Sequence, residues 1–145
     1  MGTRWTWTHL SRCYFTIWNG AISPDTRLDG WDGCSGYHYS DSLIYGFSHT
    51  HLNGTGASDY GDILVMPVSG RFEIKDYGYA SMYNHNSEVA NPGYYRVFLE
   101  NRDIDVQLTS TQRVGVYKYK YKNKKDNSIV LDLNHRDYVL AKLKW

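Results

Sequence analysis

Short runs that alternate apolar and polar residues, separated by turn residues, dominate the sequence from residue 42 onward. A period of two is typical of β-strands with one buried face, and no segment shows helical periodicity. Strands spaced by roughly 8–12 residues with Gly, Asn and Pro between them predict an all-β protein, an antiparallel β-sandwich. The predicted strands are residues 43–48, 62–68, 71–75, 94–100, 104–109, 113–122, 128–133 and 138–142.

Several details of this sheet can be predicted. Ile104, Val106 and Leu108 should share one buried face, because alternate side chains of a strand point the same way. Pro92-Gly93 predicts a tight turn that starts a strand at Tyr94 and Tyr95, and Ser69-Gly70 predicts a short hairpin between strands 62–68 and 71–75.

Charge and cysteine content exclude several classes of function. The formal net charge is only +1, so no electrostatic footprint for nucleic acid or an anionic membrane is present. The basic run at residues 118–125 alternates Lys with Tyr, which predicts a solvated strand with lysines that guard a sheet edge. Two cysteines, Cys13 and Cys34, are too few for a disulfide scaffold and wrongly spaced for zinc.

The stretch DGWDGCSGYHYSD at residues 29–41 has almost no aliphatic side chain and is predicted to be a working loop. The chain has 14 Tyr and 5 Trp, and aromatic side chains with a polar group suit sugar surfaces as well as strands. Trp31 is the best single candidate for a ligand contact. The alternative is that Trp31 fills the end of the sandwich.

Histidines and carboxylates offer two further types of chemistry. On a strand, His49 and His51 would project from the same face and could hold a metal with Asp59 or Asp62; hydrogen-bonded loop histidines are the alternative. A glycosidase needs two carboxyl groups, and the sequence cannot pair any two of the candidates. The alternatives are loop caps for the aspartates and a surface salt bridge for Glu88. The candidates are Asp25, Asp29, Asp32, Asp59, Asp62 and Glu88.

Three blocks, taken in order, resemble glycoside hydrolase family 92, the calcium-dependent exo-acting α-mannosidases. They are SPDTRLDGWDGCSGYHYSDSLIYGFSHTHLNGTGASDYGDILVMP, HNSEVANPGYYRVFLENRDIDVQLTSTQRVGVYKYKY and SIVLDLNHRD, which extend from Ser23 to about Asp137. Residues 1–22 depart from the family pattern, which has a Gly- and His-rich opening there. Codons can be chosen for Arg4 to Ile22 that restore this opening when displaced by one base. We therefore hypothesise that residues 1–22 are frame-displaced, which sequencing of the DNA tests.

The resemblance implies that residues 1–145 are the N-terminal β-sandwich domain, part of a galactose-mutarotase-like supersandwich that is incomplete at both ends. The catalytic α/α-barrel domain, with the catalytic carboxylates and the calcium ligands, would be absent from this chain, so the chain alone would be inactive and need no cofactor. The parent enzyme would hydrolyse α-mannosides of glycans with inversion. It would be periplasmic or secreted, although the chain shows no signal peptide and no membrane span.

The resemblance also implies roles for five residues of this chain. Trp31 would border the sugar next to the cleaved mannose, while Asp32, Arg27, His49 and His51 would shape the substrate pocket. Two other interpretations remain: a non-catalytic carbohydrate-binding β-sandwich module that uses Trp31, and a non-functional fragment.

Overall fold

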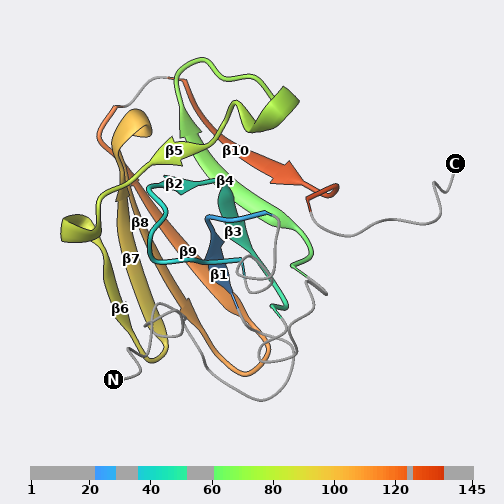
Figure 1. The fold of residues 1–145 in the computed structure, drawn as a ribbon, viewed down its shortest axis with the longest axis vertical. Helices are drawn as coiled ribbons and strands as arrows, with labels where there is room; N and C mark the ends of the chain where they lie inside the picture. Colours follow the sequence, from blue (N-terminus) through green and yellow to red (C-terminus); the bar gives the residue numbers. More distant parts are fainter. Residues whose placement is uncertain (1–21, 29–35, 52–60, 124–125, 136–145) are drawn as a thin grey trace, which may run out of the picture.

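Antiparallel strands form nearly all the regular structure in the computed structural model, which describes residues 22–28, 36–51, 61–123 and 126–135 (Figure 1). One four-stranded sheet has the order β1-β3-β4-β10, and the other has the order β6-β7-β8-β9. The first consists of β1 (Ser23–Asp25), β3 (Gly46–Ser48), β4 (Leu64–Ser69) and β10 (Asn127–Asp132). The second consists of β6 (Val89–Asn91), β7 (Tyr94–Leu99), β8 (Ile104–Ser110) and β9 (Gly115–Tyr121).

Smaller elements connect these sheets. Strands β2 (Leu43–Ile44) and β5 (Ser81–Met82) pair with each other in a two-stranded sheet. The 3₁₀ turns are η2 (Lys75–Tyr77), η3 (His85–Ser87) and η4 (Glu100–Arg102). None of the described residues forms a helix long and apolar enough to cross a membrane.

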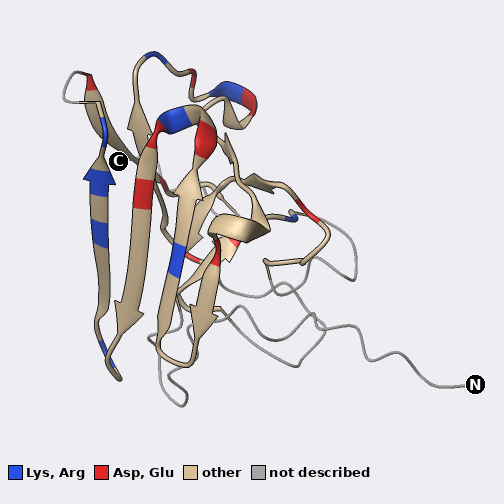
Figure 2. Cartoon of the chain, turned by 90° about the vertical axis from the view of Figure 1, so that its left-hand side faces the viewer, with Lys and Arg blue, Asp and Glu red and all other residues tan. Residues whose placement is uncertain are grey.

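The two larger sheets face each other across one hydrophobic core, which confirms the predicted antiparallel sandwich (Figures 1 and 2). The predicted inward face of β8 is confirmed, because Ile104 and Val106 are 0% exposed and Leu108 is 1% exposed. The turn at Pro92-Gly93 is also confirmed. Register pairs Asn91 with Tyr94, so these two residues close the β6–β7 hairpin, and Gly93 takes the positive φ of 77° that such a turn needs.

The predicted strand at 71–75 and the predicted Ser69-Gly70 hairpin are wrong. Gly70 has a φ of 77°, and β4 ends just before it. The partner of β4 on this side is β10, not a strand formed by residues 71–75. The alternation in 71–75 does not reflect burial, because Ile74 is 71% exposed. The segment instead leads into η2, and Arg102 stabilises it by donating from Nη1 to the Arg71 carbonyl at 3.1 Å.

Other strand predictions agree to within a few residues. Residues 43–48 form two short strands separated at Tyr45, whose N–H donates to the Asp25 carbonyl at 2.8 Å. Strands β1, β5 and β6 were not predicted, because none of them is longer than three residues and a period of two cannot be recognised in so short a run. The predicted strand at 138–142 lies outside the described residues.

Two of the four end strands of the larger sheets, β9 and β10, differ in character. On β9, exposed Lys118 and Lys120 alternate with half-buried tyrosines, and blue bands mark the basic residues of this outermost strand in Figure 2. This confirms the prediction of lysines at a sheet edge, where their charge opposes pairing with another strand. On β10 and the residue that follows it, Ile129, Leu131 and Leu133 are 54%, 63% and 70% exposed.

Candidate functional site

Four polar side chains lie close together on one face of the first sheet. Strands β1 and β3 are antiparallel and pair Asp25 with Gly46, so Asp25 and Ser48 lie on the same sheet face. His51 follows three residues after Ser48, and His135 follows β10. Asp25 and Ser48 are 0% exposed, while His51 and His135 are 8% and 7% exposed. We call these four residues the Asp25 cluster.

The Asp25 carboxylate is the centre of this cluster. Ser48 Oγ donates a short hydrogen bond to Asp25 Oδ2. A hydroxyl has one proton, so His51 Nε2, 2.7 Å from Ser48 Oγ, must donate to it. Asp25 Oδ2 also lies 3.7 Å from His51 Nε2 and 3.4 Å from His135 Nε2. Two imidazoles and a hydroxyl therefore surround one buried carboxylate oxygen.

These neighbours keep Asp25 ionised. Burial by itself raises the pKa of the Asp25 carboxyl group. The charge of His51 and the close polar atoms of His135 and His51 oppose that effect, and the net result is a pKa well below the ordinary value. A buried charge with such neighbours stabilises the fold only while those neighbours are in place.

The Asp25 cluster contains Ser, His and Asp, yet it is not arranged as a nucleophilic triad. In a triad the histidine lies between the serine and the aspartate and accepts the serine proton. Here Ser48 gives its proton directly to Asp25, and no side chain of the cluster is more than 8% exposed. The arrangement is suited to holding backbone segments together rather than to attack on a substrate.

Gly36 connects the Asp25 cluster to the loop that contains Trp31. A Cβ atom at Gly36 would lie 2.5 Å from Asp25 Oδ1 and 2.7 Å from His51 Cε1. The N–H groups of Thr26 and Arg27 both donate to the Gly36 carbonyl, at 2.7 and 3.0 Å. Gly36 directly follows residues 29–35, and His51 directly precedes residues 52–60, so the cluster fixes one end of each of these segments.

The structure separates His49 from His51, and the prediction that both project from one strand face is wrong. Strand β3 ends at Ser48, and Thr50 has a φ of 56°, which turns the chain between the two histidines. His49 Nδ1 lies 3.0 Å from the Ile63 carbonyl oxygen, and His49 Nε2 lies 2.9 Å from the Tyr117 hydroxyl. Within the described residues, no three His, Cys, Asp or Glu side chains could hold a metal ion together.

Arg27 lies on the segment after β1 and binds Asp41. Its Nη2 is 2.5 Å from Asp41 Oδ1, its Nε is 3.2 Å from Asp41 Oδ2, and Nη2 also reaches Ser40 Oγ at 3.2 Å. Thr26 Oγ1 donates to Asp41 Oδ2 at 3.0 Å. This pairing joins the described residues that precede residue 29 to those that follow residue 35. Trp31 and Asp32 themselves lie outside the described residues.

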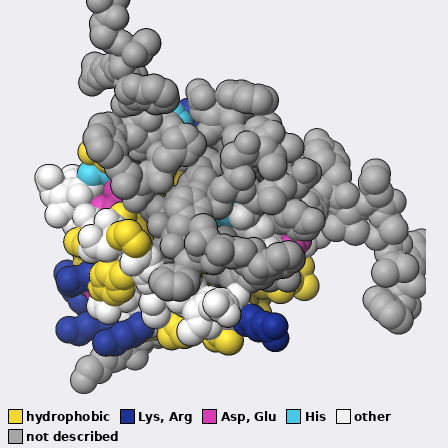
Figure 3. Space-filling model, turned by 90° about the horizontal axis from the view of Figure 1, so that it is seen from below, with side chains coloured by type: hydrophobic (Ala, Val, Ile, Leu, Met, Phe, Trp, Pro, Cys, Tyr) yellow, Lys and Arg dark blue, Asp and Glu magenta, His cyan; other side chains and the backbone are white. Residues whose placement is uncertain are grey.

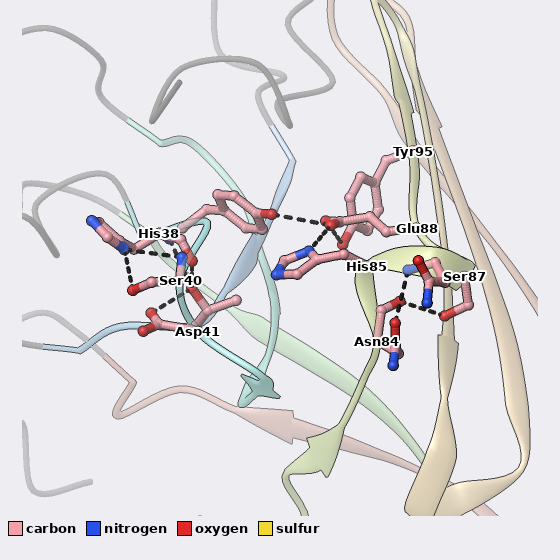
Figure 4. A network of polar contacts seen from close by, with 11 residues as sticks. His38, Ser40, Asp41, Asn84, His85, Ser87, Glu88 and Tyr95 are labelled. Carbon is pink, nitrogen blue, oxygen red and sulfur yellow. Dashed lines mark hydrogen bonds and ion pairs between the residues drawn. The ribbon is translucent and has the colours of Figure 1, made fainter. Parts of the chain in front are cut away.

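Glu88 is the centre of a second, partly buried network, shown in Figure 4. Its Oε1 accepts from the Tyr95 hydroxyl at 2.7 Å, and its Oε2 accepts from the Tyr37 hydroxyl at 3.1 Å and from His85 Nδ1 at 2.6 Å. The expected salt bridge is present as a pair with His85, whose side chain is 32% exposed, but the Glu88 side chain itself is only 7% exposed. Burial, followed by the Glu88 charge, raises the pKa of Tyr95, which therefore stays protonated and donates.

We expect Tyr95→Phe to lower the free energy of unfolding by about 2 kcal/mol, because a buried hydrogen bond to an ionised group is lost. Urea unfolding followed by circular dichroism measures this change. Tyr94→Phe is the matched control, since the Tyr94 hydroxyl makes no hydrogen bond within the described residues, and it should change stability by less than about 0.5 kcal/mol. Equal losses in the two variants would contradict the role given to Glu88.

In the view from below, Lys and Arg side chains of the described residues lie along the lower margin of the face (Figure 3). The sequence offered Asp25 and Glu88 as candidate carboxylates but did not point to Ser48, His135 or the tyrosine partners of Glu88 as their neighbours. Ser48, His135 and Tyr37 lie in the polar blocks SHTH, LNHRD and SGYHY, whereas Tyr95 lies in the predicted strand 94–100 and carries no such signal.

Comparison with protein families identifies the chain. Residues 20–143 match the family model described as the glycosyl hydrolase family 92 N-terminal domain. The chain belongs to glycoside hydrolase family 92. This match covers most of the chain and confirms the resemblance seen in its three sequence blocks. Comparison with curated proteins gives no match.

Solved structures of family 92 enzymes are similar to the chain. The α-mannosidase BT3965 of Bacteroides thetaiotaomicron, solved in complex with mannoimidazole, is 34% identical, with a TM-score of 0.82 over 90% of this chain and 18% of that one. The inverting mannosidase BT2199 of the same organism is 27% identical, with a TM-score of 0.74 over 86% of this chain and 17% of that one. The family 92 glycosyl hydrolase ccman5 is 31% identical, with a TM-score of 0.66 over 79% of this chain and 17% of that one. The chain thus spans less than a fifth of the length of these relatives.

Proposed function

We propose that this chain is the N-terminal domain of an exo-acting α-mannosidase that hydrolyses α-mannosides of glycans with inversion of configuration. The observation that carries the proposal is the match of residues 20–143 to the family 92 N-terminal domain, together with 34% identity to an α-mannosidase solved with mannoimidazole. Similarity to an enzyme described as an inverting mannosidase supports the stereochemical outcome.

In this proposal the domain binds substrate through its loops. Trp31 borders the sugar next to the cleaved mannose, while Asp32, Arg27, His49 and His51 shape the pocket. The geometry of the described residues supports a shaping role, because Arg27 is paired with Asp41, His49 bridges Ile63 and Tyr117, and His51 is buried in the Asp25 cluster. Holding a sugar in its reacting position can lower a barrier by several kcal/mol.

The proton-transferring groups belong to another part of the parent enzyme. Inversion needs two carboxyl groups roughly 6.5–9.5 Å apart on either side of the scissile bond. The Asp25 and Glu88 side chains are only 0% and 7% exposed, and Asp25 Oδ2 and both Glu88 oxygens already accept hydrogen bonds from neighbouring side chains, so neither carboxylate is placed to act on a sugar. We propose that the general acid, the general base and the calcium ion lie in an α/α-barrel catalytic domain, and that the parent enzyme is periplasmic or secreted, as the family resemblance implies.

Binding and hydrolysis by the chain itself test this function. We expect the chain to bind α-1,2-mannobiose, detected by tryptophan fluorescence, and to release no mannose from it. Trp31→Ala should weaken binding by roughly tenfold through loss of one aromatic stacking contact. Trp5→Ala is the matched control and should leave the affinity unchanged, since Trp5 lies in the segment that departs from the family pattern.

Three results would contradict the proposal. Release of mannose by the chain would show that it contains its own catalytic carboxylates. Equal binding of cellobiose and mannobiose would favour a general carbohydrate-binding module. Unchanged affinity in Trp31→Ala would remove Trp31 from the substrate pocket.

A further inference from the structure

Tyr39 presents an aromatic ring to solvent. Its side chain is 56% exposed, and it is the one aromatic residue among the exposed large hydrophobics of the described chain. The ring stacks on His85, with centroids 4.2 Å apart and planes inclined by 20°. Tyr39 follows Gly36 by three residues, so this surface belongs to the same segment that leaves the Trp31 loop. Stacking on His85 restrains one face of the ring and leaves a preformed platform.

A buried network fixes the orientation of His85. Its Nδ1 lies 2.6 Å from Glu88 Oε2, and a carboxylate can only accept, so Nδ1 carries the proton. Tyr83 restrains the imidazole from a second side, with ring centroids 5.2 Å apart and planes at 82°. Figure 4 shows one ring nitrogen of His85 directed at Glu88 and the other directed away from it. In the neutral imidazole this second nitrogen, Nε2, is an acceptor, and it makes no hydrogen bond within the described residues.

This arrangement exceeds what is needed to fasten the loop to the sheet. Tyr37, two residues before Tyr39, already donates to Glu88 Oε2 and joins the segment to β6 and β7. Tyr95 independently donates to Glu88 Oε1. The contributions specific to His85 and Tyr39 are a flat apolar face and an oriented acceptor, placed side by side at the surface.

A hexopyranose matches both features. Its C–H face packs on an aromatic ring, and the hydroxyl groups around its rim donate to an oriented acceptor. We propose that Tyr39 and His85 form a contact site for a hexopyranose unit of the mannoside glycan, separate from the sugar bound at Trp31. This inference rests on the proposed function and adds a second point of contact with the same substrate class.

Nuclear magnetic resonance on the whole chain tests the site directly. With ¹³C label in the Tyr and His side chains, addition of α-1,2-mannotriose should shift the ring signals of Tyr39 and His85, which the variants Tyr39→Ala and His85→Gln assign. Tyr39→Ala should lower the affinity for mannotriose roughly fivefold, the effect of one lost stacking contact. Val116→Ala, at an exposed position on β9, is the control and should change neither the signals nor the affinity.

The outcomes separate the site from the proposed function. In one outcome mannotriose binds and Trp31→Ala weakens this binding, but the Tyr39 and His85 signals do not shift and the affinity of Tyr39→Ala stays within twofold of that of the unchanged chain. The second contact site is then wrong and the proposed function stands. If no mannoside binds to the chain, both are wrong. If cellotriose shifts the same signals equally, the site does not select mannosides. If Tyr39→Ala unfolds at the same temperature as the unchanged chain, misfolding is excluded as the cause of a lower affinity.

Discussion

Asp25→Asn should lower the free energy of unfolding by roughly 3–5 kcal/mol, because removal of one partner from a buried ionic group leaves the others without compensation. The Asp25 side chain is fully buried, and Ser48, His51 and His135 all direct polar atoms at Oδ2. Folded domains are stable by only about 5–15 kcal/mol, so the variant should unfold at a much lower urea concentration. Urea titration followed by circular dichroism measures the change.

Asp62→Asn is the control for this experiment. Asp62 is an exposed carboxylate in the same region and accepts one hydrogen bond, from Thr50 Oγ1 at 2.9 Å. Its replacement should change stability by less than about 1 kcal/mol. A loss below about 1 kcal/mol in Asp25→Asn as well would show that the Asp25 cluster does not stabilise the fold.

The pH dependence of the same variant gives an independent check. Folding lowers the pKa of Asp25 below its value in the unfolded chain, which is about 4. The ionised carboxylate therefore contributes its full stabilisation when the pH is above about 4. That contribution is lost as the pH falls below about 4 toward the lowered pKa of the folded state. The stability difference between the unchanged chain and Asp25→Asn should therefore be constant near pH 6 and shrink below pH 4. A difference that grows on acidification would contradict this assignment.

Gly36→Ala should lower the free energy of unfolding by roughly 2–4 kcal/mol, for two additive reasons. Gly36 has a φ of 81°, a conformation that costs a residue with a Cβ atom on the order of 1 kcal/mol. The new Cβ would also lie 2.5 Å from Asp25 Oδ1 and 2.7 Å from His51 Cε1, which forces the cluster to move. Overpacking of this kind typically costs a further 1–3 kcal/mol.

Gly70→Ala separates the two contributions. Gly70 has a similar φ of 77°, but a Cβ there would meet no atom within 4 Å. Only the backbone term of about 1 kcal/mol should remain. Both variants can be compared by urea unfolding under the same conditions. Equal losses in the two glycine variants would show that the close approach of Gly36 to Asp25 and His51 has no energetic consequence.

The sequence predicted the longer strands well, because their alternation matches real burial. Val97, Val106 and Val130 all face the core, as a period of two requires. The alternation in residues 71–75 is equally regular, yet it is not a strand, because the positive φ of Gly70 ends β4 and Ile74 faces solvent. Local pattern cannot show which alternating segments find a partner strand.

The candidate site was predicted in composition but not in arrangement. The position of Asp25 beside His135 depends on the pairing of β4 with β10, which no local spacing reveals. His49 and His51 were expected to act together, and a single turn at Thr50 directs them to different partners. Glu88 was one of several equivalent carboxylates in the sequence, and only the fold shows that two tyrosines and a histidine surround it.

The span of the Asp25 cluster bears on how the chain acquires its structure. Asp25 lies in the first described strand, and His135 is the last residue that the structure describes. Contacts between residues so distant along the chain form late, because the intervening loop entropy must be overcome first, and proteins rich in them fold slowly. The Asp25 cluster should therefore assemble during synthesis only after β10 and His135 have left the ribosome.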